Sequence, residues 1–482
     1  MQNTKLINLL KVLNSRELQR FEEYVHSPFF NKHQATRRLC KHLLSLAPRF
    51  EHKRKLGKEY LFQLLYPDLD YEYIRLHRTF AQLLALLKDF LVQLQQEKDK
   101  SHHQVLLLEQ LRQRKAEKQL PIAIRRFKTL SNKKQDHQQT FYNNYLYYNE
   151  LDLQFIEKGA HAYDENLQLK SNSLDLFFIL EKLKIACDMA SRNVVVKADY
   201  ECALLNDILN HVAEHQASLS PIILIYESIL QMRTAAATAA AAENHYKNMI
   251  RLLKEHRKHF TKMEVMDIYG YALNFSIQQI NQGKSNYYQE AFQHYQYLVE
   301  EKIILINNHL QVFEYINIVT LGMRVEAYTW VEQFIHNYKQ YVPVADREKA
   351  YNYNLASLFY QTKAYEKALQ TLHNVEFTRP NFYIQVKLIQ LKCYYELDEG
   401  DALQSLLSTF SNYLHRKNVS EYWKLANLNT IKITKKLYQL KEKRLFLSKK
   451  QYLRLYEQTQ SLIETLQPLS NKVWLETALN TL

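Results

Sequence analysis

The chain contains few of the residues that interrupt regular structure. Only 6 Gly and 8 Pro occur in its 482 residues. Sheet proteins, and enzymes whose turns cradle a phosphate or expose a nucleophile, use glycine at backbone positions that other residues avoid. Long helices joined by polar loops do not need it. The scarcity therefore argues against those classes and favours an all-α chain.

Cysteine is equally scarce, and its four copies are Cys40, Cys187, Cys202 and Cys393. None forms a CxxC pair, and no second cysteine lies close enough to complete a metal knuckle. This usage is typical of free thiols in a reducing compartment rather than of a disulfide framework.

Long apolar runs and a secretory leader are also missing. The short apolar run from Leu6 to Leu13 is interrupted by Asn8 and Lys11, and no small-residue cleavage site follows it. No stretch approaches the roughly 18–20 apolar residues that a membrane span requires. We therefore expect a cytoplasmic protein without a membrane partner.

Apolar and aromatic residues are plentiful. Hydrophobic residues make up 46% of the chain, and it contains 35 Tyr and 22 Phe. Many of the aromatic residues recur at helical spacing beside Leu and Ile, which favours packing between helices over stacking on nucleic-acid bases.

Capping residues and prolines predict the helices of the N-terminal part. Asn14 precedes an amphipathic helix that Pro28 ends, and Asp70 is expected to cap a long helix that runs to about Glu97. The apolar face of the long helix is expected to begin at Ile74. A wholly polar stretch at 98–103 marks the first domain boundary.

The next region, residues 101–261, also reads as helices. Pro121 and Pro221 fall at predicted helix starts, where a missing N–H is tolerated. Residues 234–242 read TAAATAAAA. Alanine favours a helix with a thin face that a neighbour could approach, but the run could equally be an expansion without a role.

A helix-pair pattern stands out within residues 349–380. Leu355 and Ala356 are followed at helical spacing by Phe359, and Ala368 is followed by Leu372 four residues later. The small residues allow two antiparallel helices to cross closely, and the large ones fill the space around the crossing. Pro380 closes the pattern, while Asn352 and Val375 depart from it.

Weaker copies surround this unit. Together with this unit they open at positions 271, 321, 355 and 391, which are 50, 34 and 36 residues apart. These copies comprise Tyr271-Ala272 with Phe275, Ala291 and Tyr295; Leu321-Gly322 with Trp330, Phe334 and Tyr338; and Leu391 with Tyr395, Ala402 and Leu406.

With these motifs, residues 262–417 resemble tetratricopeptide-repeat proteins. The resemblance implies a right-handed α-solenoid of antiparallel helix pairs, joined to an N-terminal helical domain. The predicted domains are an N-terminal helical domain (1–100), a helical-repeat-like region (101–261), tetratricopeptide-like repeats (262–417) and basic capping helices (418–482).

The whole chain is also similar to an uncharacterised family of long helical proteins from Bacteroidota. Four motifs carry this similarity: Ser27-Pro-Phe-Phe-Asn31, Ala272-Leu-Asn274 followed by Ile280-Asn-Gln-Gly283, Asn317-Ile-Val-Thr-Leu-Gly322, and Tyr394-Tyr-Glu-Leu397. The family is uncharacterised, so the similarity implies no activity.

Motifs for catalysis, metals and cofactors do not emerge. Gly283-Lys284-Ser285 ends like a phosphate-binding loop, but Gln278 stands where its first glycine is needed, so the segment is predicted to be a turn. The pairs His211/His215 and His256/His259 have no obvious third ligand nearby. We therefore predict no catalytic residue, metal or cofactor.

Charge is distributed unevenly along the chain. The balance is +13 over residues 1–140, −7 over 141–415 and +10 over 416–454. The basic ends permit an anionic partner, contact with the acidic middle or homo-oligomerisation, or they are simply well solvated. Candidate anion-binding residues are Lys435, Lys436, Lys443 and Arg444, interleaved with Tyr438, Phe446, Tyr452 and Tyr456 on an expected core face.

The leading hypothesis is a non-enzymatic scaffold that binds a protein or peptide partner on the concave surface of the repeats. In the best repeat, resemblance to groove-forming repeats points to Tyr353, Ser357 and Tyr360 as partner-reading residues. The alternative that these tyrosines pack against the next repeat stays open. The alternative function is a nucleic-acid-associated helical protein that uses its basic ends.

Overall fold

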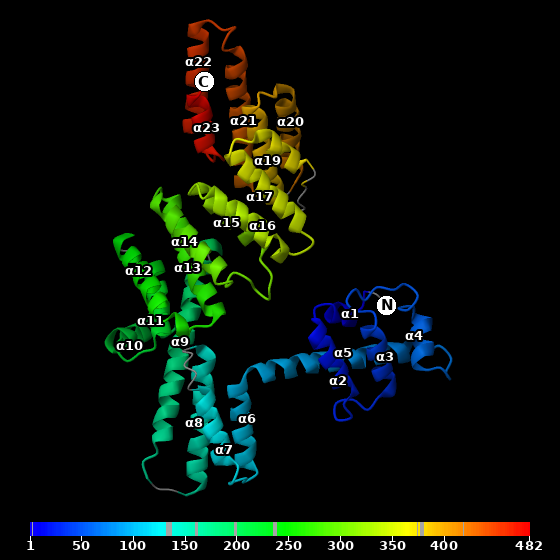
Figure 1. Ribbon diagram of the computed structural model, residues 1–482. Coiled ribbons are helices and arrows are strands. Elements are labelled where there is room, and N and C mark those ends of the chain that lie inside the picture. Colours follow the sequence, from blue (N-terminus) through cyan, green and yellow to red (C-terminus); the bar gives the residue numbers. More distant parts are fainter. Residues whose placement is uncertain are drawn as a thin grey trace. The chain divides into compact units, whose positions relative to one another are not determined.

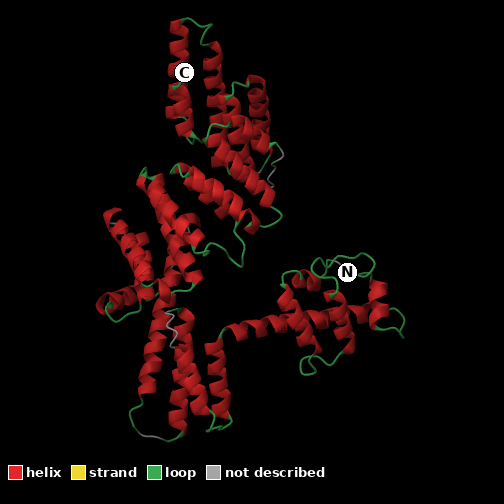
Figure 2. Cartoon of the chain, viewed as in Figure 1, coloured by secondary structure: helices red, strands yellow, loops and turns green. Residues whose placement is uncertain are grey.

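The computed structural model describes residues 1, 3–131, 137–159, 162–196, 200–234, 239–373, 375, 380–417 and 419–482. Every regular element in these ranges is a helix (Figures 1 and 2), apart from one isolated bridge between Ile306 and His309. The all-α prediction is confirmed. None of the described helices is long and apolar enough to cross a bilayer.

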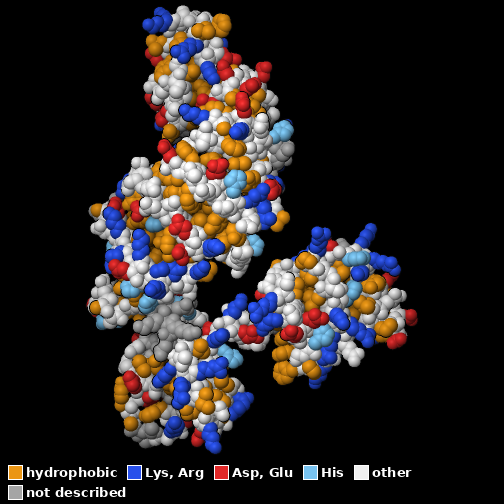
Figure 3. Space-filling model, viewed as in Figure 1, with side chains coloured by type: hydrophobic (Ala, Val, Ile, Leu, Met, Phe, Trp, Pro, Cys, Tyr) orange, Lys and Arg blue, Asp and Glu red, His pale blue; other side chains and the backbone are white. Residues whose placement is uncertain are grey.

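The chain divides into two compact units, Met1–Phe260 and Thr261–Leu482, which we call unit 1 and unit 2. The boundary between them, after Phe260, lies one residue before the predicted boundary at 261/262. The finer four-part division stays a prediction. Figure 3 shows Lys and Arg side chains on the visible surface of both units.

Unit 1 consists of twelve α-helices and one short 3-10 helix within the described residues. They are α1 (Lys5–Leu10), α2 (Ser15–His26), α3 (Gln34–Leu44), α4 (Lys58–Leu65), α5 (Tyr73–Lys98), α6 (Lys100–Gln113), α7 (Leu120–Ser131), α8 (Gln138–Glu157), α9 (Glu165–Val196), α10 (Leu205–His215), α11 (Pro221–Thr234), α12 (Ala239–Glu255) and η1 (Arg257–His259).

The long helix α5 organises the first five helices, because α1, α2, α3 and α4 all contact it. The predicted cap of α2 is confirmed: Asn14 accepts from the Glu17 N–H, and Glu17 reaches back to the Asn14 N–H. The predicted cap of α5 is wrong. The helix begins at Tyr73 after an extended Glu72, so Asp70 lies two residues too early to cap it. Ile74 is 57% exposed rather than buried.

The remaining helices of unit 1 pack mostly on their neighbours in the chain, with α6 against α7 and α8, and α9 against α8, α10 and α11. Pro121 lies in the first turn of α7 and Pro221 opens α11, as predicted. Residues 235–238 of the alanine-rich run lie outside the described residues.

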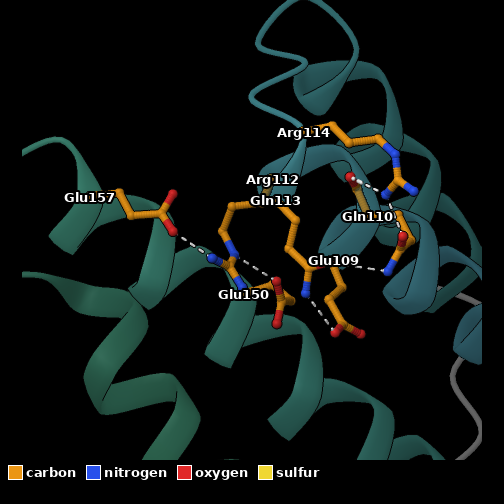
Figure 4. Close-up of polar contacts among 7 residues, drawn as sticks. All are labelled: Glu109, Gln110, Arg112, Gln113, Arg114, Glu150 and Glu157. Carbon is orange, nitrogen blue, oxygen red and sulfur yellow. Dashed lines mark hydrogen bonds and ion pairs between the residues drawn. The ribbon is translucent and has the colours of Figure 1, made fainter.

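An arginine joins α6 to α8 (Figure 4). Arg112 Nε donates to Glu150 Oε2 at 2.9 Å, and Arg112 Nη1 donates to Glu157. The Arg112 and Glu150 side chains are only 14% and 10% exposed, so each charge depends on the other for compensation. The neighbouring Arg114 is exposed and reaches only the Gln110 side chain and carbonyl on its own helix.

Unit 2 contains eleven α-helices and one 3-10 helix within the described residues. They are α13 (Lys262–Asn281), α14 (Asn286–Glu300), α15 (Val312–Arg324), α16 (Tyr328–Tyr338), η2 (Lys339–Tyr341), α17 (Arg347–Gln361), α18 (Tyr365–Leu372), α19 (Pro380–Glu396), α20 (Gly400–Arg416), α21 (Glu421–Lys443), α22 (Lys449–Thr465) and α23 (Lys472–Asn480). Each α-helix contacts the next along the chain, and α17 also contacts both α15 and α19.

One turn geometry recurs in unit 2. The turns after α13, α15, α17 and α19 each contain a residue of positive φ: Gly283, Glu326, Lys363 and Asp398. In each turn the next residue donates its N–H to the carbonyl five residues back, over 2.8 to 3.1 Å. This pairing satisfies the last carbonyls of the helix and reverses the chain. The predicted turn at Gly283 is thus confirmed.

Small residues lie where the paired helices approach most closely. Ala272, Ala356 and Ala368 are fully buried. At Gly322 an added Cβ would lie 2.4 Å from Val331 Cγ2 and 3.0 Å from Phe292 Cε2, and both of these side chains are buried. At this position α15 can therefore pack against Phe292 of α14 and Val331 of α16 only if the residue is glycine.

Gly322→Ala is expected to destabilise the protein by about 1–3 kcal/mol, because neither buried neighbour can make room for the methyl group. Gly270→Ala is the control. Gly270 lies inside α13 with nothing within 4 Å of an added Cβ, so alanine should stabilise that helix by roughly 0.5–1 kcal/mol. Urea unfolding measures both changes, and effects of the same sign would contradict the close approach at Gly322.

Arg112→Leu is expected to lower the free energy of unfolding by about 2–4 kcal/mol, because it leaves the Glu150 carboxylate buried without its cation. Arg114→Leu should change it by less than about 0.5 kcal/mol, since that side chain is exposed. Equilibrium unfolding of the full chain compares the two variants, and equal losses would show that the Arg112 contacts contribute little.

Candidate functional site

The structure buries two of the three residues predicted to read a partner. Tyr353 is 8% exposed and Ser357 is 7% exposed, and the Ser357 hydroxyl donates to the Tyr353 carbonyl at 2.8 Å. Tyr353 packs in a cluster with Ile316 of α15 and Val386 of α19. A partner cannot reach these side chains without separating the helices, so the prediction is corrected for Tyr353 and Ser357. Tyr360 is half-buried at the end of α17 and stays a prediction.

The fourth copy of the predicted repeat has a lysine in its sequence motif where the other copies have a small residue. Lys392 follows Leu391 of α19 as Ala272, Gly322 and Ala356 follow the opening residues of the earlier copies, although the four residues lie at different distances from the turn that ends their helix. A lysine cannot occupy a dry helix crossing as alanine does, because its ammonium group requires polar partners. The structure supplies those partners from outside the helix pair.

The Lys392 ammonium is held by one amide and two aromatic rings. Its Nζ donates to Asn471 Oδ1 at 2.6 Å. The same nitrogen lies 5.6 Å from the centroid of the Tyr360 ring and 5.8 Å from that of the Trp474 ring, within the range of cation–π attraction. No carboxylate among the described residues lies within ion-pair distance of it. We call Tyr360, Lys392, Asn471 and Trp474 the Lys392 cluster.

Buried polar side chains of α21 place Asn471 at the start of α23. Asn429 donates to the Pro468 carbonyl at 2.9 Å, and Thr430 donates to the Ser470 carbonyl at 2.7 Å. Both donors are buried, so these bonds are shielded from water. The segment before α23 is therefore held against α21, which presents the Asn471 amide oxygen to α19.

Trp474 completes the cluster from α23. Its ring meets the Tyr395 ring edge to face, with centroids 5.4 Å apart and planes at 82°. Its Nε1 donates to the exposed Glu396 carboxylate at 3.4 Å. Trp474 is itself half-buried, so part of this residue stays accessible.

The surroundings lower the pKa of Lys392. Burial, and secondarily repulsion by Arg324, lower the pKa of Lys392 to about 8, while the thiol of Cys393 acts in the opposite direction. At neutral pH the amine is still mostly protonated. The site is thus a partly desolvated cation flanked by aromatic rings, which is an arrangement suited to an anionic group of a partner.

The four predicted anion-binding residues lie along α21 and at its end. Lys435, Lys443 and Arg444 are exposed and Lys436 is half-buried. The ion pairs shown on this helix use Lys424 and Lys441, and none of the four forms one within the described part of the chain.

The expected aromatic core face of this region is partly wrong. Tyr438 is buried at 6% exposure, and Tyr452 and Tyr456 pack partly against the core. Phe446, however, is 86% exposed, because it lies in the turn between α21 and α22 rather than in either helix.

Sequence reasoning missed Lys392 and Trp474. A signal for Lys392 was present, because a charged residue breaks a pattern of small residues at 272, 322 and 356. No comparable signal marked Trp474 or Asn471, which come from a helix outside the repeats and approach Lys392 only through the contacts of α21.

Comparison of the chain with protein-family models, with curated proteins and with solved structures gives no match. Within the described ranges, no group of three or more His, Cys, Asp and Glu side chains is arranged to hold a metal ion.

The Lys392 cluster should make stability depend on pH in a defined direction. The pKa of Lys392 is lower in the folded protein than its ordinary value of 10.5, so the unfolded chain binds the proton more tightly between pH 8 and 10.5. Stability contributed by this residue therefore rises with pH across that window.

Lys392→Met removes this titration while keeping a similar aliphatic stem. Between pH 7.5 and pH 10 the free energy of unfolding of the wild type should rise by roughly 1–3 kcal/mol more than that of the variant. Urea unfolding at the two pH values measures the difference. Parallel pH profiles for the two proteins would show that Lys392 titrates normally.

Proposed function

We propose that this chain is a scaffold that binds a protein or peptide partner, and that unit 2 is a right-handed α-solenoid of antiparallel helix pairs. Two observations support the solenoid. The four helix-pair turns share one geometry, and α17 contacts α15 and α19 directly as well as its chain neighbours. Stacked helix pairs present a continuous surface to an extended ligand.

The binding surface of this scaffold centres on the Lys392 cluster. The observation that carries the proposal is a half-buried lysine, flanked by Tyr and Trp rings, whose partner is an amide and which has no carboxylate partner in the part of the chain that the structure describes. Tyrosine and tryptophan dominate the energetics of protein interfaces when they are anchored on one side and accessible on the other. An Asp or Glu side chain, or a C-terminal carboxylate, of the partner would pair with the ammonium group.

The chain provides a matched control for this site. Lys441 is also half-buried and lies 5.2 Å from the centroid of a tyrosine ring, that of Tyr395. Unlike Lys392, it already pairs with a carboxylate, that of Asp398, at 3.0 Å. Replacing Lys441 therefore removes a half-buried lysine that also lies beside a tyrosine ring but whose charge is already paired within the chain.

Lys392→Met is expected to weaken partner binding by about 10- to 100-fold, the loss of one charge-assisted contact. Lys441→Met should bind as wild type does. Tagged full-length proteins are used to isolate stoichiometric partners from native lysate, and the purified partner is then titrated against each variant. A partner retained equally by wild type and Lys392→Met would remove the cluster from the binding surface.

The alternative function, association with nucleic acid, stays a prediction. The observation that favours it is the exposure of Lys435, Lys443 and Arg444 without ion-pair partners in the described residues. Such a contact would read phosphate charge rather than sequence, and its affinity would fall steeply with salt.

A further inference from the structure

The turn between α21 and α22 exposes two large apolar side chains. Leu445 is 91% exposed and Phe446 is 86% exposed. From Lys443 to Gln451 no residue is buried, so this end of the helical hairpin extends beyond the packed core of unit 2. Figure 1 shows the turn at the far end of the α21–α22 hairpin from α20. We call residues 443–450 the hairpin tip.

Hydrogen bonds define the shape of the hairpin tip. Phe446 and Leu447 both donate their N–H groups to the Lys443 carbonyl at 3.0 Å. Ser448 caps α22 through a reciprocal capping box with Gln451. The two apolar side chains therefore lie on an ordered turn. Binding through them costs little conformational entropy of the backbone.

Four basic residues, which we call the basic collar, precede and follow the two apolar side chains in the chain. Lys443, Arg444, Lys449 and Lys450 are all exposed. Residues 441–454 contain six Lys and Arg but a single acidic residue, Glu442. Figure 3 shows basic and hydrophobic side chains together at this end of unit 2.

The combination of features decides between classes of partner. Phosphate groups of a nucleic acid would satisfy the charges and the bases of a single strand would stack on Phe446, but the aliphatic Leu445 would stay in water. An anionic bilayer satisfies both, because its headgroups attract Lys and Arg while its interfacial region accepts apolar side chains. Such a peripheral contact lies on the membrane rather than crossing it, so it needs no spanning helix, and the described residues contain none.

We propose that the hairpin tip docks on an anionic lipid bilayer, with Leu445 and Phe446 entering the interface and the four basic side chains contacting lipid phosphates. This contact revises the expectation of a protein without a membrane partner. It lies apart from the Lys392 cluster, so it would place the scaffold at a membrane surface without occupying the proposed partner site.

Co-sedimentation of the full chain with vesicles tests the proposal. Phosphatidylcholine vesicles with equal phosphatidylglycerol are compared with pure phosphatidylcholine, and a 20-nucleotide single strand is titrated in parallel. Wild type should partition at least tenfold better onto the anionic vesicles. The double variant Leu445→Ser/Phe446→Ser should lose this tenfold preference for anionic vesicles. The variant with Lys443, Arg444, Lys449 and Lys450 changed to Gln should lose it as well.

Matched controls separate the tip from general surface effects. Phe29→Ser removes an equally exposed phenylalanine of unit 1, and Lys367→Gln/Lys432→Gln removes two exposed lysines of unit 2 that lie outside the tip and outside the predicted anion-binding set. Both should partition within about twofold of wild type. Since all of these side chains lie on the surface, thermal melting should show every variant folded.

No partition onto anionic vesicles, or partition that the serine pair leaves unchanged, overturns the proposal. Binding of the oligonucleotide that the serine pair does not alter, without vesicle binding, also overturns it and assigns the basic collar to nucleic acid. Vesicle binding lost through the serine pair supports it, whether or not the oligonucleotide binds.

Discussion

The close approach of paired helices is the constraint on which unit 2 depends. Two helices can cross at short distance only where a side chain is nearly absent, and Ala272, Gly322 and Ala356 provide that at successive positions. The left-handed residue in each turn then directs the chain back along the helix it has just left. Because the two helices of each pair lie close together, large aromatic and aliphatic side chains fill the spaces between successive pairs.

Lys392 carries a charge among the tightly packed helices, and its setting explains the candidate site. The residue is half-buried in α19, so its ammonium group requires polar partners. Those partners come from α23, which α21 holds in place through Asn429 and Thr430. The charge of Lys392 has thus been accommodated by α23, leaving a cation with aromatic neighbours.

The sequence predicts local structure well where one residue decides the outcome. The Asn14 cap, the prolines at helix starts, the small residues at crossings and the turn at Gly283 all act within a few residues of the chain. It fails where neighbours decide. Tyr353 occupies a groove position in the repeat pattern, but the adjacent pairs close over it. Helical periodicity placed Phe446 on a core face, whereas a turn ends the helix first.

The assembly of the candidate site from distant parts of the chain has a consequence for biosynthesis. Tyr360, Lys392 and Trp474 are supplied by three helices, and the amide that holds the lysine comes from residue 471. A ribosome must therefore release all of α23 before the cluster exists. Until then Lys392 has one ring beside it and no amide, so a nascent or clipped chain presents no completed surface. A partner that recognises the cluster would distinguish finished molecules from unfinished ones.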